Sequence, residues 1–414
     1  MRTVIIGGGV IGLGTAYRLA KAGQEVTVVD AALVGSGASH GNAGWVIPPD
    51  VGPVAAPGMV LKALKWMLHS DSPLYVRPSL EPDFVRFMLA MARRCNASDF
   101  DAVFRANLTL CEGTMDLLDQ MSADGVAFEM HTDGLFMAHA DEHNFHKRVA
   151  GLATSREYGM DPEVLSGPQL AEREPGLKPT LAGAVYFPHV RFIRPDSFMA
   201  GLAQRCRGLG VQIIENAPVS AVRRAGDRVT AVVTPHGDVT GDQFLLAAGV
   251  HSGRLAGLFG RKLPIRPGKG YSIEFPNPPV QLTRAVNLSD AKVAVTPLAA
   301  GLRLAGTMEF AGLDSNINAA RIAAIKRAPL DYFTSWDATD SHHSQPWAGA
   351  RPMTADGMPI IGALPSVANA WVAAGHGMLG MTLGHVTSVA VADAMSGGTL
   401  PAGFDVFSPQ RFAR

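Results

Sequence analysis

The chain has 414 residues, 47% of them hydrophobic, and its 36 acidic residues balance its 36 basic residues. This length exceeds what one compact core usually organises, so two domains are expected. The balanced charge, without a long run of one sign, argues against a nucleic-acid surface, and no apolar run reaches the roughly 18 residues of a membrane-spanning helix. Three cysteines (Cys95, Cys111 and Cys206) stand far apart, which predicts no zinc site, no disulfide framework and a reducing, cytoplasmic compartment.

Residues 3–30 have the pattern of a dinucleotide-binding unit. An apolar run at 4–6 predicts a strand buried on both faces. Gly7, Gly9 and Gly12 then permit a tight turn, close approach of the backbone to a pyrophosphate, and packing of a helix on the strand. Asp30 ends a second strand, where its carboxylate can accept the ribose hydroxyls of an adenosine and would repel a 2′-phosphate, which argues against NADP.

The next segment, 35–44, reads GSGASHGNAG. A loop this rich in glycine, alanine and serine can lie against a flat ring system without steric conflict. A flexible surface loop is the alternative.

Residues 59–69, MVLKALKWMLH, form an amphipathic helical pattern with Leu61, Leu64 and Leu68 on one face. Such a stripe either packs on its own domain or lies on a membrane surface. Further helical patterns follow within 81–122, and their apolar positions are expected in the core: Phe84, Phe87, Met88 and Met91.

Strand-like alternation recurs through the middle of the chain, at 126–139 and 181–195. Together with 267–275, 292–297 and 301–307, these segments predict a mixed, largely antiparallel sheet that roofs the cofactor. Between them, 211–222 and 241–253 return the chain to the nucleotide domain. There, Val219 is a candidate for backbone contact with adenine, and Gly249 allows close approach to the cofactor.

The segment WAGARPMTADGMPIIG (347–362) places Arg351 among apolar and turn-forming residues. Desolvating a guanidinium without a partner is costly, and a bound carboxylate would satisfy it with two parallel hydrogen bonds. A structural pair with Asp356 is the alternative. Tyr271 is a second candidate for the substrate site, or else an aromatic core residue.

Residues 371–398 read as a strand, a glycine-rich turn and an apolar helix that begins at about Leu379. The positive end of that helix would stabilise the negative charge of a reduced flavin. His376 in the turn either tunes protonation near the ring or only shapes the turn. With the loop at 35–44 and the strand that ends at Gly249, this segment selects FAD over NAD.

At this point the chain resembles the D-amino-acid oxidase superfamily of flavoproteins over nearly its full length, and within it the bacterial D-amino-acid dehydrogenases. The resemblance is carried by GSGASHGNAG, PGKGYSIEF (267–275), 347–362 and AAGHGMLGMTLG (373–384). It implies an α/β fold in which a Rossmann-like FAD domain (1–58, 194–262 and 345–414) is interleaved with a substrate domain (59–193 and 263–344) built on a mixed, largely antiparallel sheet with helices. The predicted FAD contacts are Gly7, Gly9, Val10, Ile11, Gly12, Asp30, Ser39, His40, Asn42, Ala43, Gly44, Val219, Gly249, Gly377, Met378, Leu379, Gly380, Met381 and Thr382.

The resemblance also implies a reaction. A hydride passes from Cα of a D-amino acid, or of a D-imino acid such as D-proline or D-hydroxyproline, to flavin N5, and the imine hydrolyses to a keto acid. Arg351, Tyr271 and His376 are the expected active-site residues, no metal is expected, and FAD is expected to be non-covalent, with His40 as the one residue that leaves attachment open. Relatives that hold the carboxylate with a tyrosine would need one near 292–297, where none is present, and Arg303 lies roughly where some oxidases carry a lysine near N5.

Three matters stay open in the sequence. The electron acceptor is expected to be quinone or a redox partner, with peripheral contact to the inner face of a membrane. A glycine- or sarcosine-type oxidase that makes hydrogen peroxide is one alternative. A flavin subunit of a larger dehydrogenase complex is the other, although the chain has no iron–sulfur cysteine spacing of its own.

Overall fold

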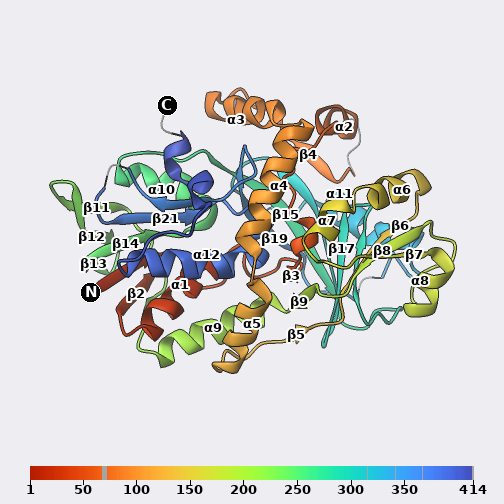
Figure 1. The fold of residues 1–414 in the computed structure, drawn as a ribbon, viewed down its shortest axis with the longest axis horizontal. Helices are drawn as coiled ribbons and strands as arrows, with labels where there is room; N and C mark the ends of the chain where they lie inside the picture. The colour runs from red at the N-terminus through yellow and green to blue at the C-terminus, as the bar shows by residue number, and fades with distance from the viewer. Residues whose placement is uncertain (68–71, 315, 341, 366, 413–414) are drawn as a thin grey trace.

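The computed structural model describes residues 1–67, 72–314, 316–340, 342–365 and 367–412. Six strands form a first sheet in the order β10-β2-β1-β14-β21-β20 (Figure 1). Their bounds are Gln212–Ile214 (β10), Glu25–Val29 (β2), Arg2–Ile6 (β1), Gln243–Leu246 (β14), Ala370–Ala374 (β21) and Ile360–Ala363 (β20). Neighbouring strands run parallel except β20 and β21. The Rossmann-like fold predicted from the N-terminal pattern is confirmed.

Successive side chains of this sheet enter two different apolar cores, as expected for strands that are buried on both faces. Ile5 and Leu245 pack with helices on one face, namely Val10–Lys21 (α1), Pro195–Gly208 (α9) and Gly380–Met395 (α12). Val4 and Phe244 face the other way and pack against β12 of a three-stranded sheet made of Ala221–Ala225 (β11), Arg228–Thr234 (β12) and Gly237–Thr240 (β13).

A nine-stranded, largely antiparallel sheet forms the other half of the molecule (Figure 1). Its order is β19-β15-β18-β17-β16-β6-β8-β7, and β4 pairs with β18. The bounds are Trp347–Thr354 (β19), Ile265–Phe275 (β15), Gly301–Phe310 (β18), Val293–Leu298 (β17), Ala285–Leu288 (β16), Leu135–His139 (β6), Gly183–Phe187 (β8), Glu163–Ser166 (β7) and Leu74–Val76 (β4). All five segments predicted for the mixed sheet contribute strands to it.

Strand β19 pairs along its whole length with β15. The domain boundary expected at residue 345 therefore separates this strand from the sheet to which it is hydrogen-bonded. We propose instead that the chain returns to the FAD domain after Thr354.

The remaining elements surround the junction of the two halves. A small sheet joins Trp45–Val46 (β3), Arg191–Ile193 (β9) and Met130–His131 (β5). The other helices are Met59–Trp66 (α2), Pro82–Arg93 (α3), Ala97–Cys111 (α4), Thr114–Ala123 (α5), Glu142–Ala150 (α6), Ala153–Glu157 (α7), Gly167–Arg173 (α8), Ser252–Leu255 (α10) and Ala319–Arg327 (α11). No described helix combines the length and the apolar character that crossing a bilayer requires.

Helix α2 presents part of its apolar stripe to solvent. Leu61 is 69% exposed and Leu64 is 57% exposed, whereas Met59 and Trp66 pack against an apolar cluster that includes the buried Phe87 of α3. The simple expectation that the stripe packs on its own domain is therefore wrong for these two leucines. Leu68, the third predicted member of the stripe, lies outside the described residues.

Candidate functional site

One cavity of about 1060 Å³ runs along the junction of the two large sheets. At one end it is lined by Asp30 and Val219 of the Rossmann-like half. At the other end it is lined by Tyr271 and Arg351 of the nine-stranded sheet. A site that spans both halves is a common location for a bound small molecule, and here the long shape suits a dinucleotide with a substrate at its far end.

The glycine turn after β1 leaves no room for side chains. Gly7 has φ +108°, and a Cβ there would lie 2.5 Å from the carbonyl oxygen of Ala247. A Cβ on Gly12 would overlap the carbonyl oxygen of Gly7. The close approach brings the start of α1 against the cavity, where Val10 N–H donates to Ser39 Oγ at 3.1 Å. The first turn of a helix carries unpaired N–H groups and a partial positive charge, so the turn fits a pyrophosphate.

Asp30 lies on the cavity wall where the adenosine is predicted to bind. Its carboxylate accepts hydrogen bonds from Gly8 N–H at 2.6 Å and Ala32 N–H at 2.9 Å. Burial raises the pKa of this carboxyl, and the two backbone donors oppose that rise. The carboxylate keeps further lone pairs, which ribose hydroxyls can use.

The turn before α12 holds His376 as a neutral base. Thr387 donates its hydroxyl hydrogen to the carbonyl of Leu383, so its oxygen accepts from His376 Nε2–H at 3.0 Å. This leaves Nδ1 as a lone-pair acceptor, and in this cavity-lining residue Nδ1 is buried with no hydrogen-bond partner among the described residues. Desolvation lowers the pKa of His376 to about 3. A bound group with a hydroxyl or N–H would satisfy this orphaned nitrogen, which supports the fit of a cofactor here.

The neutral burial of His376 makes stability depend on pH in a defined direction. Between its folded pKa of about 3 and the ordinary value of 6.5, the unfolded chain binds a proton that the folded chain does not. The free energy of unfolding should therefore decrease as pH falls through this window. In His376→Gln, we expect urea unfolding of the FAD-saturated protein to show a pH slope smaller by up to one proton, about 1.4 kcal/mol per pH unit. Equal slopes in wild type and variant would contradict the prediction.

Arg351 has no carboxylate partner among the described residues. Its Nη1 donates to the carbonyl of Thr307 at 2.8 Å, and the guanidinium lies so close over Gly270 that a Cβ there would overlap it. Desolvation lowers the pKa of Arg351 to about 10. The alternative pairing with Asp356 is wrong, because Asp356 instead pairs with Arg411 at 2.8 Å. Arg351 therefore presents free, desolvated donors to the cavity.

Tyr271 lines the same end of the cavity but directs its hydroxyl elsewhere. The hydroxyl donates to Glu309 Oε2 at 2.9 Å, and the ring is 1% exposed within the apolar core of the nine-stranded sheet. Glu309 lies 3.4 Å from the buried Lys269. This geometry favours the core interpretation of Tyr271, and its role in substrate binding stays a prediction.

Most of the predicted site residues meet on this cavity. In addition to Arg351, Tyr271 and His376, the lining includes Gly7, Gly9, Val10, Ile11, Asp30, Ser39, Asn42, Ala43, Gly44, Val219, Gly249, Gly377, Met378, Leu379, Gly380 and Met381. Three predicted contacts do not line it: Gly12 packs on the turn, Thr382 accepts the N–H of Ile47, and His40 is exposed. Gly12 and Thr382 face the packing behind the wall, whereas the side chain of His40 faces solvent.

Lys292 and Thr307 are among the polar residues of the wall that sequence reasoning missed. Both have left-handed backbone angles, with φ +58° and φ +63°. Neither lies in a recognisable motif, and only the strand register reveals them. Arg303, by contrast, does not line the cavity; it pairs with Glu274 and donates to the carbonyl of Asn42.

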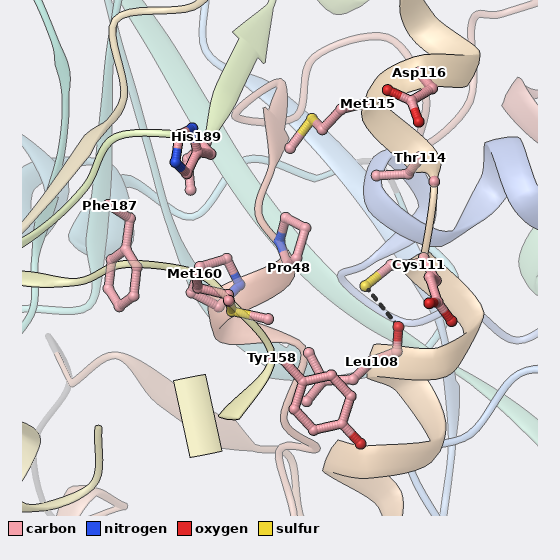
Figure 2. Close-up of a pocket in the computed structure, with 15 residues that line it drawn as sticks. Pro48, Leu108, Cys111, Thr114, Met115, Asp116, Tyr158, Met160, Phe187 and His189 are labelled. Carbon is pink, nitrogen blue, oxygen red and sulfur yellow. Dashed lines mark hydrogen bonds between the residues drawn. The ribbon is translucent and has the colours of Figure 1, made fainter. Parts of the chain in front are cut away.

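Figure 2 shows a second, smaller pocket, of about 350 Å³. It shares no lining residue with the main cavity, although Pro48 in its wall directly follows Ile47 of the main wall. Figure 2 shows the hydrogen bond that the thiol of Cys111 donates to the carbonyl oxygen of Leu108. Burial raises the pKa of that thiol to about 12, so the wall carries a neutral thiol and no thiolate nucleophile.

Comparison with known proteins agrees with this geometry. Residues 2–394 match the model of the family DAO, described as FAD dependent oxidoreductase. A protein of Azorhizobium caulinodans named D-amino acid dehydrogenase is 34% identical, with 96% of each chain covered. One of the same name from Bradyrhizobium diazoefficiens is 33% identical, covering 100% of this chain and 99% of the other.

Solved structures of similar fold support the architecture. Glycine oxidase from Geobacillus kaustophilus has a TM-score of 0.78 at 22% identity, with 99% of each chain covered. L-proline dehydrogenase from P. horikoshii has a TM-score of 0.75 at 18% identity, covering 100% of this chain and 98% of that one. At these identities, the likeness concerns the fold.

Proposed function

Because this chain belongs to the DAO family of FAD-dependent oxidoreductases, we propose that it catalyses the oxidative deamination of D-amino acids. Family membership gives the enzyme class and the cofactor, which is FAD. The substrate class is the proposal, and it is supported by relatives of 33–34% identity that carry the name D-amino acid dehydrogenase.

The observation that carries the proposal is the guanidinium of Arg351 on the cavity wall, which has no carboxylate partner among the described residues. A substrate α-carboxylate would accept two parallel hydrogen bonds from it, which fixes the orientation of Cα. Bound FAD supplies the acceptor for the hydride that leaves Cα. The product imine then takes up water and gives a keto acid and ammonia. His376 is neutral and Tyr271 is committed to Glu309, so neither of these two residues adds a charged acid or base beside the amino acid.

Quinone or a redox protein is the proposed electron acceptor, on the inner, cytoplasmic face of a membrane. The exposed Leu61 and Leu64 of α2, with Lys62 and Lys65 between and beside them, support peripheral contact with a lipid surface. Met59 and Trp66 of the same helix line the main cavity. Helix α2 therefore contributes both to the proposed lipid contact and to the cavity wall.

Anaerobic bleaching of the bound flavin tests the proposal. The panel should include D- and L-amino acids, glycine, sarcosine, D-proline and D-hydroxyproline. We expect rapid bleaching by D-substrates only. Bleaching by glycine or sarcosine with peroxide formation under air would favour an oxidase instead, and no bleaching by any of these compounds would refute the proposed substrate class. Full activity of the isolated chain with an artificial dye would contradict the alternative of an obligate subunit of a larger complex.

A further inference from the structure

Two cationic residues, Arg351 and Lys292, lie on the two sides of Thr307 in the nine-stranded sheet. Arg351 of β19 reaches across β15 to the carbonyl of Thr307 in β18. On the far side, Val293 of β17 pairs with Gly306, so Lys292 and Thr307 are adjacent across the β17–β18 ladder. Arg351, Thr307 and Lys292 all line the cavity.

Two side chains of this cluster, Thr307 and Lys292, lack polar partners among the described residues. Thr307 Oγ1 is buried and has no hydrogen-bond partner in the described part of the chain. Lys292 forms no ion pair within 4.0 Å to a described residue, and desolvation lowers the pKa of its ammonium. Thr307 Oγ1 is thus a buried donor without a partner, which is costly, whereas Lys292 is exposed and presents its positive charge on the cavity wall. The cluster therefore favours an anionic ligand.

The nearby carboxylates of the wall are not available to neutralise the cluster. Asp314 pairs with Lys269 at 2.7 Å. Asp50 lies 4.0 Å from Arg148. Asp314 and Glu309 share Lys269, and Asp50 lies between the charges of Arg148 and Lys292, so none of these acids forms an ion pair with Arg351 or Lys292 within 4.0 Å.

We propose that the preferred substrate is an acidic D-amino acid, with its α-carboxylate on Arg351 and its side-chain carboxylate on Lys292. This inference rests on the proposed function and narrows its substrate class. Ala294, the next cavity-lining residue of β17, has only a methyl side chain and leaves space for the substrate chain.

Matched substrates test the assignment. D-Glutamate and D-glutamine have nearly the same shape and differ in one charge, as do D-aspartate and D-asparagine. In wild type we expect kcat/KM for the acid to exceed that for its amide by about 10- to 100-fold, the range of one charge-assisted hydrogen bond. In Lys292→Met the preference should disappear, in Lys292→Arg it should persist, and in the control Lys147→Met, on exposed α6, it should remain unchanged.

Binding of an unreactive ligand separates this inference from the proposed function. Glutarate carries two carboxylates and butyrate one, and either can be titrated by the perturbation of flavin absorbance. Tighter binding of glutarate in wild type, lost in Lys292→Met with the flavin spectrum intact, would support the site even if no D-amino acid reduced the enzyme. Equal binding of glutarate and butyrate, or an acid-to-amide ratio that Lys292→Met leaves unchanged, would overturn the inference while turnover of neutral D-amino acids left the proposed function standing.

Discussion

Arg351→Ala should retain bound FAD and lose most of its catalytic efficiency toward D-amino acids. The guanidinium is desolvated on the cavity wall, and a carboxylate brought to it in wild type would gain a charge-assisted, bidentate contact. Losing such a contact costs about 2–5 kcal/mol, which corresponds to a fall in kcat/KM of roughly 30-fold to several thousand-fold. The measurement is anaerobic flavin reduction as a function of substrate concentration.

Two further variants make this result specific. Arg266→Ala removes an arginine from β15 that pairs with Glu81 outside the cavity, so its kcat/KM should remain near the wild-type value. Arg351→Lys keeps the charge without the planar fork and should fall between wild type and Arg351→Ala. Unchanged kinetics in Arg351→Ala with a normal flavin spectrum would refute the carboxylate assignment.

Gly12→Ala should weaken FAD binding more than any single change at the substrate end. The new Cβ would overlap the carbonyl oxygen of Gly7, and a backbone atom cannot swing away as a flexible side chain can. The turn must shift, which costs on the order of 1–3 kcal/mol and moves the start of α1 away from the pyrophosphate. We expect the dissociation constant of FAD to rise by about 10- to 100-fold, measured by flavin fluorescence on reconstitution of the apoprotein.

Gly208→Ala is the matched control for this variant. Gly208 lies in the last turn of α9, and a Cβ there meets no heavy atom within 4 Å. Its FAD affinity should equal that of wild type. An equally tight cofactor complex in Gly12→Ala would show that the turn can relax without cost.

The parts of the fold that were predictable are those encoded locally. The strand, glycine turn, helix and second strand of residues 3–30 follow each other directly, so their pattern identifies the unit and the place of Asp30. The strands of the large sheet were also evident from alternation. Their neighbours were not, because β19 joins β15 across a long stretch of chain, and no local signal gives that pairing.

In the candidate site, too, the features encoded locally were predictable and those that depend on long-range contacts were not. Arg351 was recognisable from its apolar surroundings, yet the choice between a substrate and Asp356 depended on Arg411, which lies far along the chain and takes that carboxylate. Lys292 was invisible as a site residue, since its place beside Thr307 follows from strand register. For α2, the periodicity revealed the stripe but could not tell how much of it a neighbouring cluster would cover.

The order of strands in the Rossmann-like sheet has a consequence for the time course of folding. β1 emerges first during synthesis, but its neighbour β14 ends at Leu246 and the next strand, β21, ends at Ala374. Helix α12, which packs against α1, follows later still. Contacts of such long sequence separation form slowly, and chains that wait for them expose apolar surface. We therefore expect the nucleotide-binding half to close only after α12 has left the ribosome, and FAD to bind after that step.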